Sequence, residues 1–137
     1  RHALCGATLN GQSFIILVYR YFLANPAAIT VAVRELHGSS PVMRNALEAQ
    51  LEASAREMTD DTLQRGLVAG VSAEVVHEIS GMTIRYILFR AMDYLEKPAQ
   101  REKIQLETEN FILRQFRGAM LDNVPEATIH RLLKQIS

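Results

Sequence analysis

Four prolines divide this chain into segments whose apolar residues recur at helical intervals. Asn25-Pro26 and Ser40-Pro41 each place a residue that favours the helix N-cap before a proline at the first helical position, where proline loses no hydrogen bond. Lys97-Pro98 and Val124-Pro125 lie between helically periodic stretches, and the residue before a proline disfavours the α conformation. The prolines therefore predict helix boundaries at all four positions.

The apolar spacing favours helices throughout the chain. Apolar residues recur about every 3.6 positions, and no segment of strand length alternates between apolar and polar residues. We expect Gly38 to end the second helix in a left-handed conformation. The third helix either continues through Leu67 or is interrupted at Thr59-Asp60-Asp61-Thr62, whose side chains compete for backbone hydrogen bonds. The pattern predicts an all-α protein with six helices, which begin near Phe14, Pro26, Pro41, Ala73, Pro98 and Pro125.

The two long helices in the second half are apolar on more than one side. In Ala73–Glu96, one side carries Val76, Ile79 and Thr83, and the other carries Val75, Met82, Phe89 and Met92. Pro98–Leu121 is also apolar on more than one side, as expected when one side faces the core and another faces a second subunit. We therefore expect a homodimer, with these residues near its two-fold axis: Gly81, Ile84, Arg85, Leu88, Ile112, Phe116 and Met120.

The composition is that of a single globular domain, with 48% hydrophobic and 22% charged residues. Fifteen basic residues balance fifteen acidic ones, so the chain has no overall surplus of positive charge with which to bind nucleic acid. The single Cys5 forms no internal disulfide, which makes the cytoplasm the expected location. The apolar run that begins at Phe14 is broken by Arg20 and is shorter than the ~20 residues that span a bilayer.

Residue patterns for catalysis or metal binding are sparse. The histidines are His2, His37, His77 and His130, and they are too far apart to form an HxxxH or HExxH pair. Cys5 has no activating neighbour, and no glycine-rich phosphate loop is present. We expect no enzyme activity, no catalytic residue, no metal and no cofactor.

The chain contains five methionines, five phenylalanines and four tyrosines, most of them in the expected helices. Methionine and phenylalanine side chains on helices suit the wall of a pocket for a hydrophobic ligand. They equally suit an ordinary core, and the periodicity alone leaves both interpretations open.

A series of short motifs runs through the middle of the chain. It comprises Ala24-Asn25-Pro26, Arg34-Glu35, Gly38-Ser39-Ser40-Pro41, Arg44 and Ala46-Leu47, followed later by the Gly66–Gly70 region, Arg101-Glu102 and Phe111–Gly118. This series resembles the ligand-binding domain of TetR-family transcriptional regulators, and it is most similar to the branch of repressors of unsaturated fatty acid synthesis. The resemblance covers residues 12 to 121.

The resemblance implies a regulatory rather than a catalytic role. Residues 13–137 would form the effector-binding and dimerisation domain of a bacterial TetR-type repressor, with 1–12 as an N-terminal segment of uncertain structure. The last two long helices would form a four-helix bundle in the dimer. The family's helix-turn-helix domain is missing from this chain, and the absence of a methionine at Arg1 suggests a fragment. Operator DNA would be bound only through that missing domain, whose DNA affinity the effector changes.

The resemblance also implies a pocket among the helices that begin at Phe14, Pro26, Pro41 and Ala73. We expect a hydrophobic effector, with the fatty acyl type favoured. The candidate ligand-binding residues are Phe14, Leu17, Val18, Tyr21, Ile29, Val33, Met43, Leu47 and Met58. Arg34, Glu35 and Arg44 match the family run, and we interpret them as helix-terminal ion pairs that fix the turn after Gly38.

The alternative function is a helical homodimeric protein-interaction module with no small-molecule ligand. The two alternatives differ in the internal space that they require. A cavity smaller than ~300 Å³ would favour the interaction module.

Overall fold

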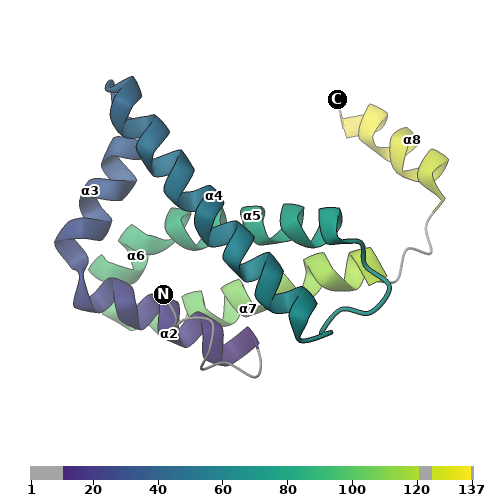
Figure 1. Cartoon of the computed structure of the whole chain (residues 1–137), viewed down its shortest axis with the longest axis horizontal. Helices are drawn as coiled ribbons and strands as arrows, with labels where there is room; N and C mark the ends of the chain where they lie inside the picture. Colours follow the sequence, from purple (N-terminus) through teal and green to yellow (C-terminus); the bar gives the residue numbers. More distant parts are fainter. Residues whose placement is uncertain (1–10, 121–124, 137) are drawn as a thin grey trace.

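The computed structural model describes residues 11–120 and 125–136, and each expected helical segment is helical there (Figure 1). Residues 1–10 of the expected N-terminal segment lie outside the described residues. The described ranges contain no strand, which confirms the all-α class. The helices are α2 (Gly11–Ala24), α3 (Pro26–Leu36), α4 (Pro41–Gln64), α5 (Ala73–Phe89), α6 (Ala91–Glu96), η1 (Pro98–Gln100), α7 (Arg101–Met120) and α8 (Glu126–Ile136).

Two helix boundaries differ from the expected ones. The segment expected as one helix from Ala73 to Glu96 is divided at Arg90 into α5 and α6. The long helix α4 ends at Gln64 instead of continuing through Leu67, because Gly66 takes a left-handed conformation with φ of 65°. The Leu67 N–H then donates to the Thr62 carbonyl at 3.4 Å, which closes the helix end in a Schellman motif.

The starts of α3 and α4 are capped differently. Ser40 caps α4, since its Oγ accepts the Met43 N–H at 3.3 Å. Asn25 makes no side-chain cap on α3, because its Nδ2 donates instead to the Tyr21 carbonyl at 3.0 Å. Pro26 therefore begins α3 through its restricted φ angle and without a capping hydrogen bond.

The turn between α3 and α4 corrects the prediction about Gly38. The expected left-handed conformation was wrong, because the positive-φ glycines among the described residues are Gly66 and Gly70. Arg44 lies in the first turn of α4 and donates from Nη1 to the Gly38 carbonyl. Arg44 thus stabilises the turn, as expected, but through a carbonyl and not through an ion pair.

The helices pack around a shared interior. α2 and α7 lie side by side, α5 lies above them, and α4 crosses in front and packs along α5 (Figure 1). α3 rises from the end of α2 and meets the first turns of α4, whereas α8 stands apart from the other helices (Figure 1).

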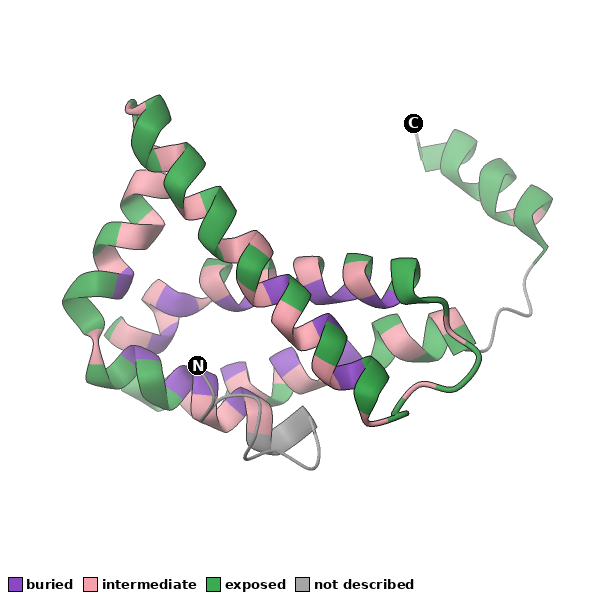
Figure 2. Ribbon diagram, viewed as in Figure 1, coloured by how far each residue is buried: buried purple, intermediate pink, exposed green. Residues whose placement is uncertain are grey.

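The hydrophobic core is centred on Tyr19 of α2, which is fully buried. Its ring stacks on Tyr94 with a centroid distance of 4.4 Å and meets the Phe22 ring edge-on at 5.7 Å. The buried residues lie where the helices face one another (Figure 2). The core comprises Ile15, Val18, Tyr19, Phe22, Ile29, Ile87, Ala91, Tyr94, Ile104 and Ile112.

The two most apolar consecutive helices are bent sharply against each other. No single helix in residues 11–120 and 125–136 is long and apolar enough to cross a membrane. Together α2 and α3 would reach that length and hydropathy, but they meet at an angle of 98°. Both helices contribute to the core of this domain.

Candidate functional site: an apolar cavity among four helices

A cavity of about 410 Å³ lies among α2, α3, α4 and α5. These are the four helices that the sequence predicts to surround a pocket. The volume is within the usual range for small-molecule sites and above the ~300 Å³ that separates the two alternative functions. The lining residues are Phe14, Val18, Tyr21, Phe22, Ala28, Ile29, Ala32, Leu47, Gln50, Leu51, Ser54, Glu57, Met58, Ile84, Ile87 and Leu88.

The cavity has a buried apolar floor and a more exposed mouth. Val18, Phe22 and Ile29 are buried and form part of the floor. Tyr21 and Ala28 are exposed, so they lie near the opening. A ligand would therefore place its apolar part against the floor and leave its other end closer to solvent.

Two features of α3 keep the cavity open. The angle of 98° between α2 and α3 directs α3 toward α4. Ala28 and Ala32 then face the cavity with side chains too small to fill it. A larger side chain at either position would occupy this space.

Contacts between α4 and α5 hold the wall opposite α3. Arg85 Nη2 lies 2.6 Å from Glu48 Oε2, and His77 Nε2 lies 3.0 Å from Glu52 Oε2. Neither pair lines the cavity, so they position α4 without placing their charges against a ligand. The small buried residue Ala55 lies on α4 between these pairs and the end of the helix.

The structure brings together most of the expected wall residues. Leu17 and Val33 are half-buried but do not line the cavity, and Val33 packs against the core instead. Met43 is 40% exposed in the first turn of α4 and lies outside the cavity lining. The expected residues that do line the cavity are Phe14, Val18, Tyr21, Ile29, Leu47 and Met58.

Sequence reasoning missed the polar part of the lining. Gln50, Ser54 and Glu57 face the cavity from α4, at spacings that place them on the same side of that helix as Leu47 and Met58. Extending the stripe from Leu47 by three and four residues would have found them.

The residues expected near a two-fold axis lie in three places: the cavity lining, the core and the surface. Ile84 and Leu88 line the cavity, and Ile112 is buried in the core, which leaves these side chains little surface for a partner. Phe116 packs partly against the core and Gly81 is half-buried. Arg85 is exposed but pairs with Glu48 of its own chain, and Met120 is 49% exposed.

A different set of residues on the same helices is exposed and apolar. On α5, Val75, Met82 and Phe89 follow one another at intervals of seven residues, and Phe89 is 81% exposed. On α7, three residues follow the same interval and are also exposed, namely Leu106, Leu113 and Met120. A seven-residue interval keeps side chains on one face of a helix that packs along another helix.

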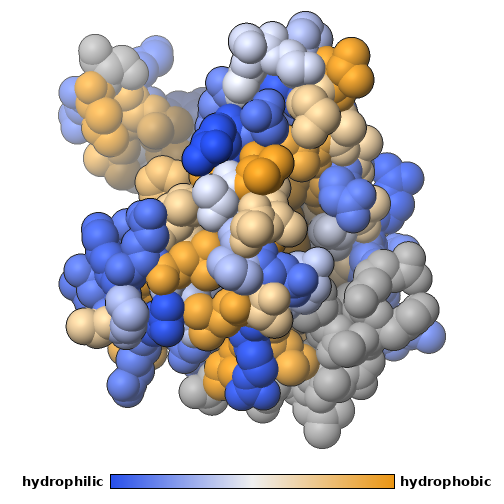
Figure 3. Space-filling view, turned by 90° about the vertical axis from the view of Figure 1, so that its left-hand side faces the viewer, coloured by the Kyte–Doolittle hydropathy of each residue, from blue (hydrophilic) through white to orange (hydrophobic). Residues whose placement is uncertain are grey.

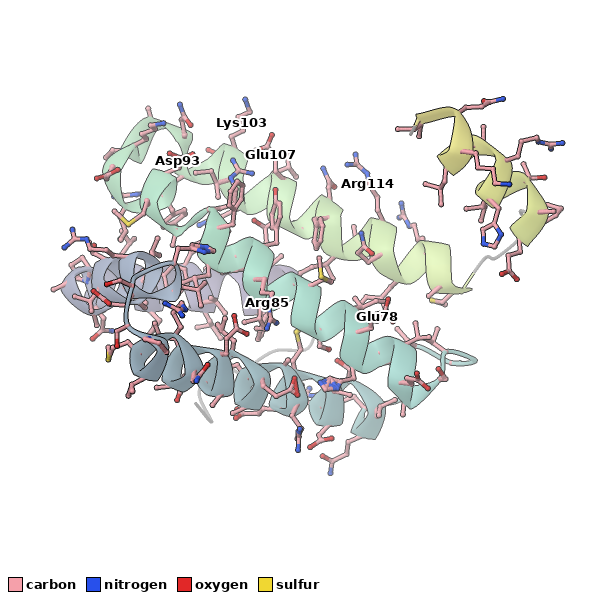
Figure 4. All side chains as sticks on the ribbon, turned by 90° about the horizontal axis from the view of Figure 1, so that it is seen from above. Glu78, Arg85, Asp93, Lys103, Glu107 and Arg114 are labelled. Atoms are coloured by element: carbon pink, nitrogen blue, oxygen red, sulfur yellow. The ribbon has the colours of Figure 1, made fainter. Side chains whose placement is uncertain are left out.

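α5, α6 and α7 also carry charged residues of both signs. Figure 4 shows Glu78 and Arg85 on α5, Asp93 on α6, and Lys103, Glu107 and Arg114 on α7. Glu107 accepts a hydrogen bond from Arg90 at 2.8 Å, which ties α7 to the break between α5 and α6. Arg85 likewise pairs with Glu48 of α4, so both Arg85 and Glu107 already have partners within the chain.

Other apolar side chains are exposed singly. Val31 of α3 and Val42 of α4 are 49% and 77% exposed. Figure 3 shows one end of the molecule, where hydrophobic patches alternate with hydrophilic ones. Single exposed apolar residues are common on protein surfaces and indicate no site.

Within the described residues, no group of three or more His, Cys, Asp or Glu side chains is placed to hold a metal ion. Comparison of the chain with protein-family models, curated proteins and solved structures finds no match. The assignment of a function therefore depends on the cavity and on the exposed faces of α5 and α7.

Proposed function

We propose that this chain is the effector-sensing and dimerisation domain of a bacterial TetR-type transcriptional repressor. In this proposal the cavity binds a hydrophobic small molecule with a long aliphatic chain, of the fatty acyl type. The bound molecule changes the DNA affinity of a helix-turn-helix domain outside this chain. The domain itself is cytoplasmic and catalyses no reaction.

The observation that carries the proposal is the cavity of about 410 Å³. The cavity opens to solvent beside Tyr21 and Ala28, and its volume lies within the range of small-molecule sites. Its floor of Val18, Phe22 and Ile29 is apolar, which suits an aliphatic chain. The volume also exceeds the ~300 Å³ below which an interaction module without a ligand would be favoured.

The exposed stripes on α5 and α7 support the second half of the proposal. Val75, Met82 and Phe89 lie on a helix face that the chain's own core leaves exposed. A second copy related by two-fold symmetry would cover this face together with the α7 stripe and form a four-helix bundle. An effector in the cavity touches Ile84 and Leu88 on the opposite side of α5, so the same helix would connect the ligand with the dimer.

Binding of uncharged fatty acyl methyl esters of increasing chain length tests the proposal. Each methylene that reaches the apolar floor should contribute about 0.8 kcal/mol to the binding free energy. The affinity, measured by calorimetry or thermal shift, should therefore rise steadily until the cavity is full. A thermal shift that stays flat across the series would contradict the proposed function.

Two alanines on α3 provide a matched pair of variants. Ala32 lines the cavity, whereas Ala27 is exposed and lies outside the lining. Ala32→Phe should fill the cavity and abolish ester binding, and Ala27→Phe should leave it unchanged. Equal losses in both variants would mean that the esters bind elsewhere.

A further inference from the structure

Two uncharged polar side chains lie next to each other on the α4 wall of the cavity. Gln50 and Ser54 are four residues apart, which places them one helical turn apart on the same side of the helix. The lining contributed by α2, α3 and α5 is apolar except for Tyr21, which is 51% exposed. A ligand with one polar end would therefore turn that end toward α4.

Gln50 and Ser54 both have unused hydrogen-bonding capacity. Gln50 is exposed, Ser54 is half-buried, and neither side chain forms a hydrogen bond within the described part of the chain. A hydroxyl within a helix often donates to the carbonyl four residues earlier, as Thr59 does to Ala55 at 2.7 Å. The Ser54 hydroxyl makes no such bond, so it remains available to a ligand.

The chemistry of these two groups suits a head that both donates and accepts hydrogen bonds. A serine hydroxyl and a glutamine carboxamide are each donor and acceptor. Side chains one turn apart have Cβ atoms about 5–6 Å from each other, and a hydrogen bond joins heavy atoms about 2.9 Å apart. A carboxamide carries its oxygen and its nitrogen on one carbon atom, so it can contact both side chains at once. An ester accepts hydrogen bonds but donates none.

A free carboxylate suits this wall less well than a carboxamide. It donates no hydrogen bond, and removing its charge from water is costly unless a cation compensates for the loss. Among the described residues that line the cavity there is no lysine, arginine or histidine. Glu57 of the same wall already has an interaction within the chain, so Gln50 and Ser54 are the groups that meet the head.

We propose that the effector carries an uncharged carboxamide at the polar end of its aliphatic chain. The amide nitrogen donates to the Ser54 hydroxyl oxygen, and the amide oxygen accepts from Gln50 Nε2. The aliphatic chain extends over Val18, Phe22 and Ile29 at the floor. This inference rests on the proposed function, since it concerns the head group of a ligand in the same cavity.

Three compounds with the same acyl chain and different heads test the head group. Decanamide, methyl decanoate and decanoate should be titrated into the chain at neutral pH by calorimetry. Decanamide should bind about tenfold more tightly than either of the other two. Transfer from water would by itself favour the ester over the amide, because burying an amide is costly when it finds no hydrogen-bond partner.

Two serine-to-alanine variants test the role of Ser54. Ser54→Ala removes the acceptor of the amide N–H, so it should weaken decanamide binding about tenfold and methyl decanoate binding much less. Ser39 is exposed in the turn before α4 and lies outside the cavity lining. Ser39→Ala should therefore change neither affinity.

Two glutamines of α4 provide the same comparison for the amide oxygen. Gln50→Leu keeps a side chain of similar size but removes the donor, and it should weaken decanamide binding about tenfold. Gln64 is exposed at the end of α4, outside the cavity lining. Gln64→Leu should leave decanamide binding unchanged.

The outcomes separate this inference from the proposed function. If none of the three compounds binds, the proposed function fails as well. If methyl decanoate or decanoate binds as tightly as decanamide, or if either Ser54→Ala or Gln50→Leu leaves decanamide binding unchanged, the aliphatic site remains and the carboxamide inference is overturned.

Discussion

Tyr19 shows how one buried polar group is accommodated in the core. Its hydroxyl lies 2.8 Å from Thr108 Oγ1, and Thr108 donates its own proton to the Ile104 carbonyl at 2.8 Å. The Tyr19 O–H is therefore the donor to Thr108. Burial raises the pKa of Tyr19 to about 12, because a phenolate in this position would lose its hydration.

The raised pKa of Tyr19 predicts a loss of stability at high pH. In the unfolded chain Tyr19 titrates near its usual pKa of about 10. Its contribution is fully present below that pH, declines by about 1.4 kcal/mol per pH unit above it, and is lost as the pH rises through about 12. Urea unfolding at several pH values should show this decline.

Tyr19→Phe is the control for that decline. The variant should be about 1 kcal/mol less stable at neutral pH, because one buried hydrogen bond is lost. It should then lose less stability than the unmodified chain between pH values of about 10 and 12. Parallel pH profiles for the two proteins would rule out Tyr19 as the titrating group.

Two buried threonines predict opposite effects of the same substitution. Thr83 of α5 and Thr108 of α7 are both fully buried, but Thr83 Oγ1 has no hydrogen-bond partner among the described residues. Thr83→Val should raise the free energy of unfolding by about 1 kcal/mol, because it removes an unsatisfied polar group. Thr108→Val should lower it by ~1–2 kcal/mol, because Tyr19 then loses its acceptor. Chemical denaturation of the two variants measures both changes in the free energy of unfolding.

The ends of the helices depend on a few local interactions. Ser40 and Ser72 cap α4 and α5 by accepting backbone N–H groups at 3.3 and 3.2 Å. Arg101 binds the end of α6, with donated hydrogen bonds to the carbonyls of Tyr94 at 2.7 Å and Leu95 at 3.0 Å. These contacts satisfy backbone groups that the helices themselves leave unpaired.

Two glycines should respond in opposite ways to replacement by alanine. Gly66 ends α4 with φ of 65°, a conformation that strains any residue with a Cβ atom. Gly66→Ala should cost about 1 kcal/mol of stability. Gly118 lies within α7 with open space around its Cα atom, so Gly118→Ala should stabilise the chain by ~0.5–1 kcal/mol. Thermal unfolding curves of both variants should shift in opposite directions, and a stabilised Gly66→Ala would contradict the Schellman assignment.

The helix α8 shows what apolar spacing in the sequence does not predict. Its apolar residues Ile129, Leu132, Leu133 and Ile136 follow helical spacing and are all exposed. The spacing predicts the helix correctly, whereas it does not say which surface the apolar side meets. An apolar side on a helix indicates that another surface covers it. The periodicity does not identify that surface, because the surface is formed by other parts of the fold.

The association of two copies is the largest-scale prediction. Met82 and Leu113 lie in the middle of the exposed stripes on α5 and α7, and they are 54% and 40% exposed. Light scattering should find a dimer at micromolar concentration. The double variant Met82→Lys with Leu113→Lys should be monomeric, because four lysines would be buried in the interface of the dimer.

Val42 provides the control for the dimer variants. It is apolar and 77% exposed, but it lies in the first turn of α4, away from both stripes. Val42→Lys should therefore remain dimeric. An unmodified chain that stays monomeric at high micromolar concentration would exclude the four-helix bundle.

The positions of the helices were largely encoded in local sequence. Proline at Pro26, Pro41 and Pro98 restricts φ, and apolar spacing of about 3.6 residues selects the helix in any surroundings. Even so, the division at Arg90 was not predictable. Arg90 stabilises that break through hydrogen bonds to Tyr86 and Glu107, and Glu107 lies on a different helix.

Only the tertiary structure shows what each side of a helix faces. Apolar periodicity showed that α5 has two apolar sides, but it could not show that Ile84 and Leu88 face a cavity while Met82 and Phe89 face outward. That difference depends on where α4 crosses α5 and on the angle of 98° between α2 and α3. Local propensity acts through neighbouring residues, whereas a cavity is formed by the distances between helices that are far apart in the sequence.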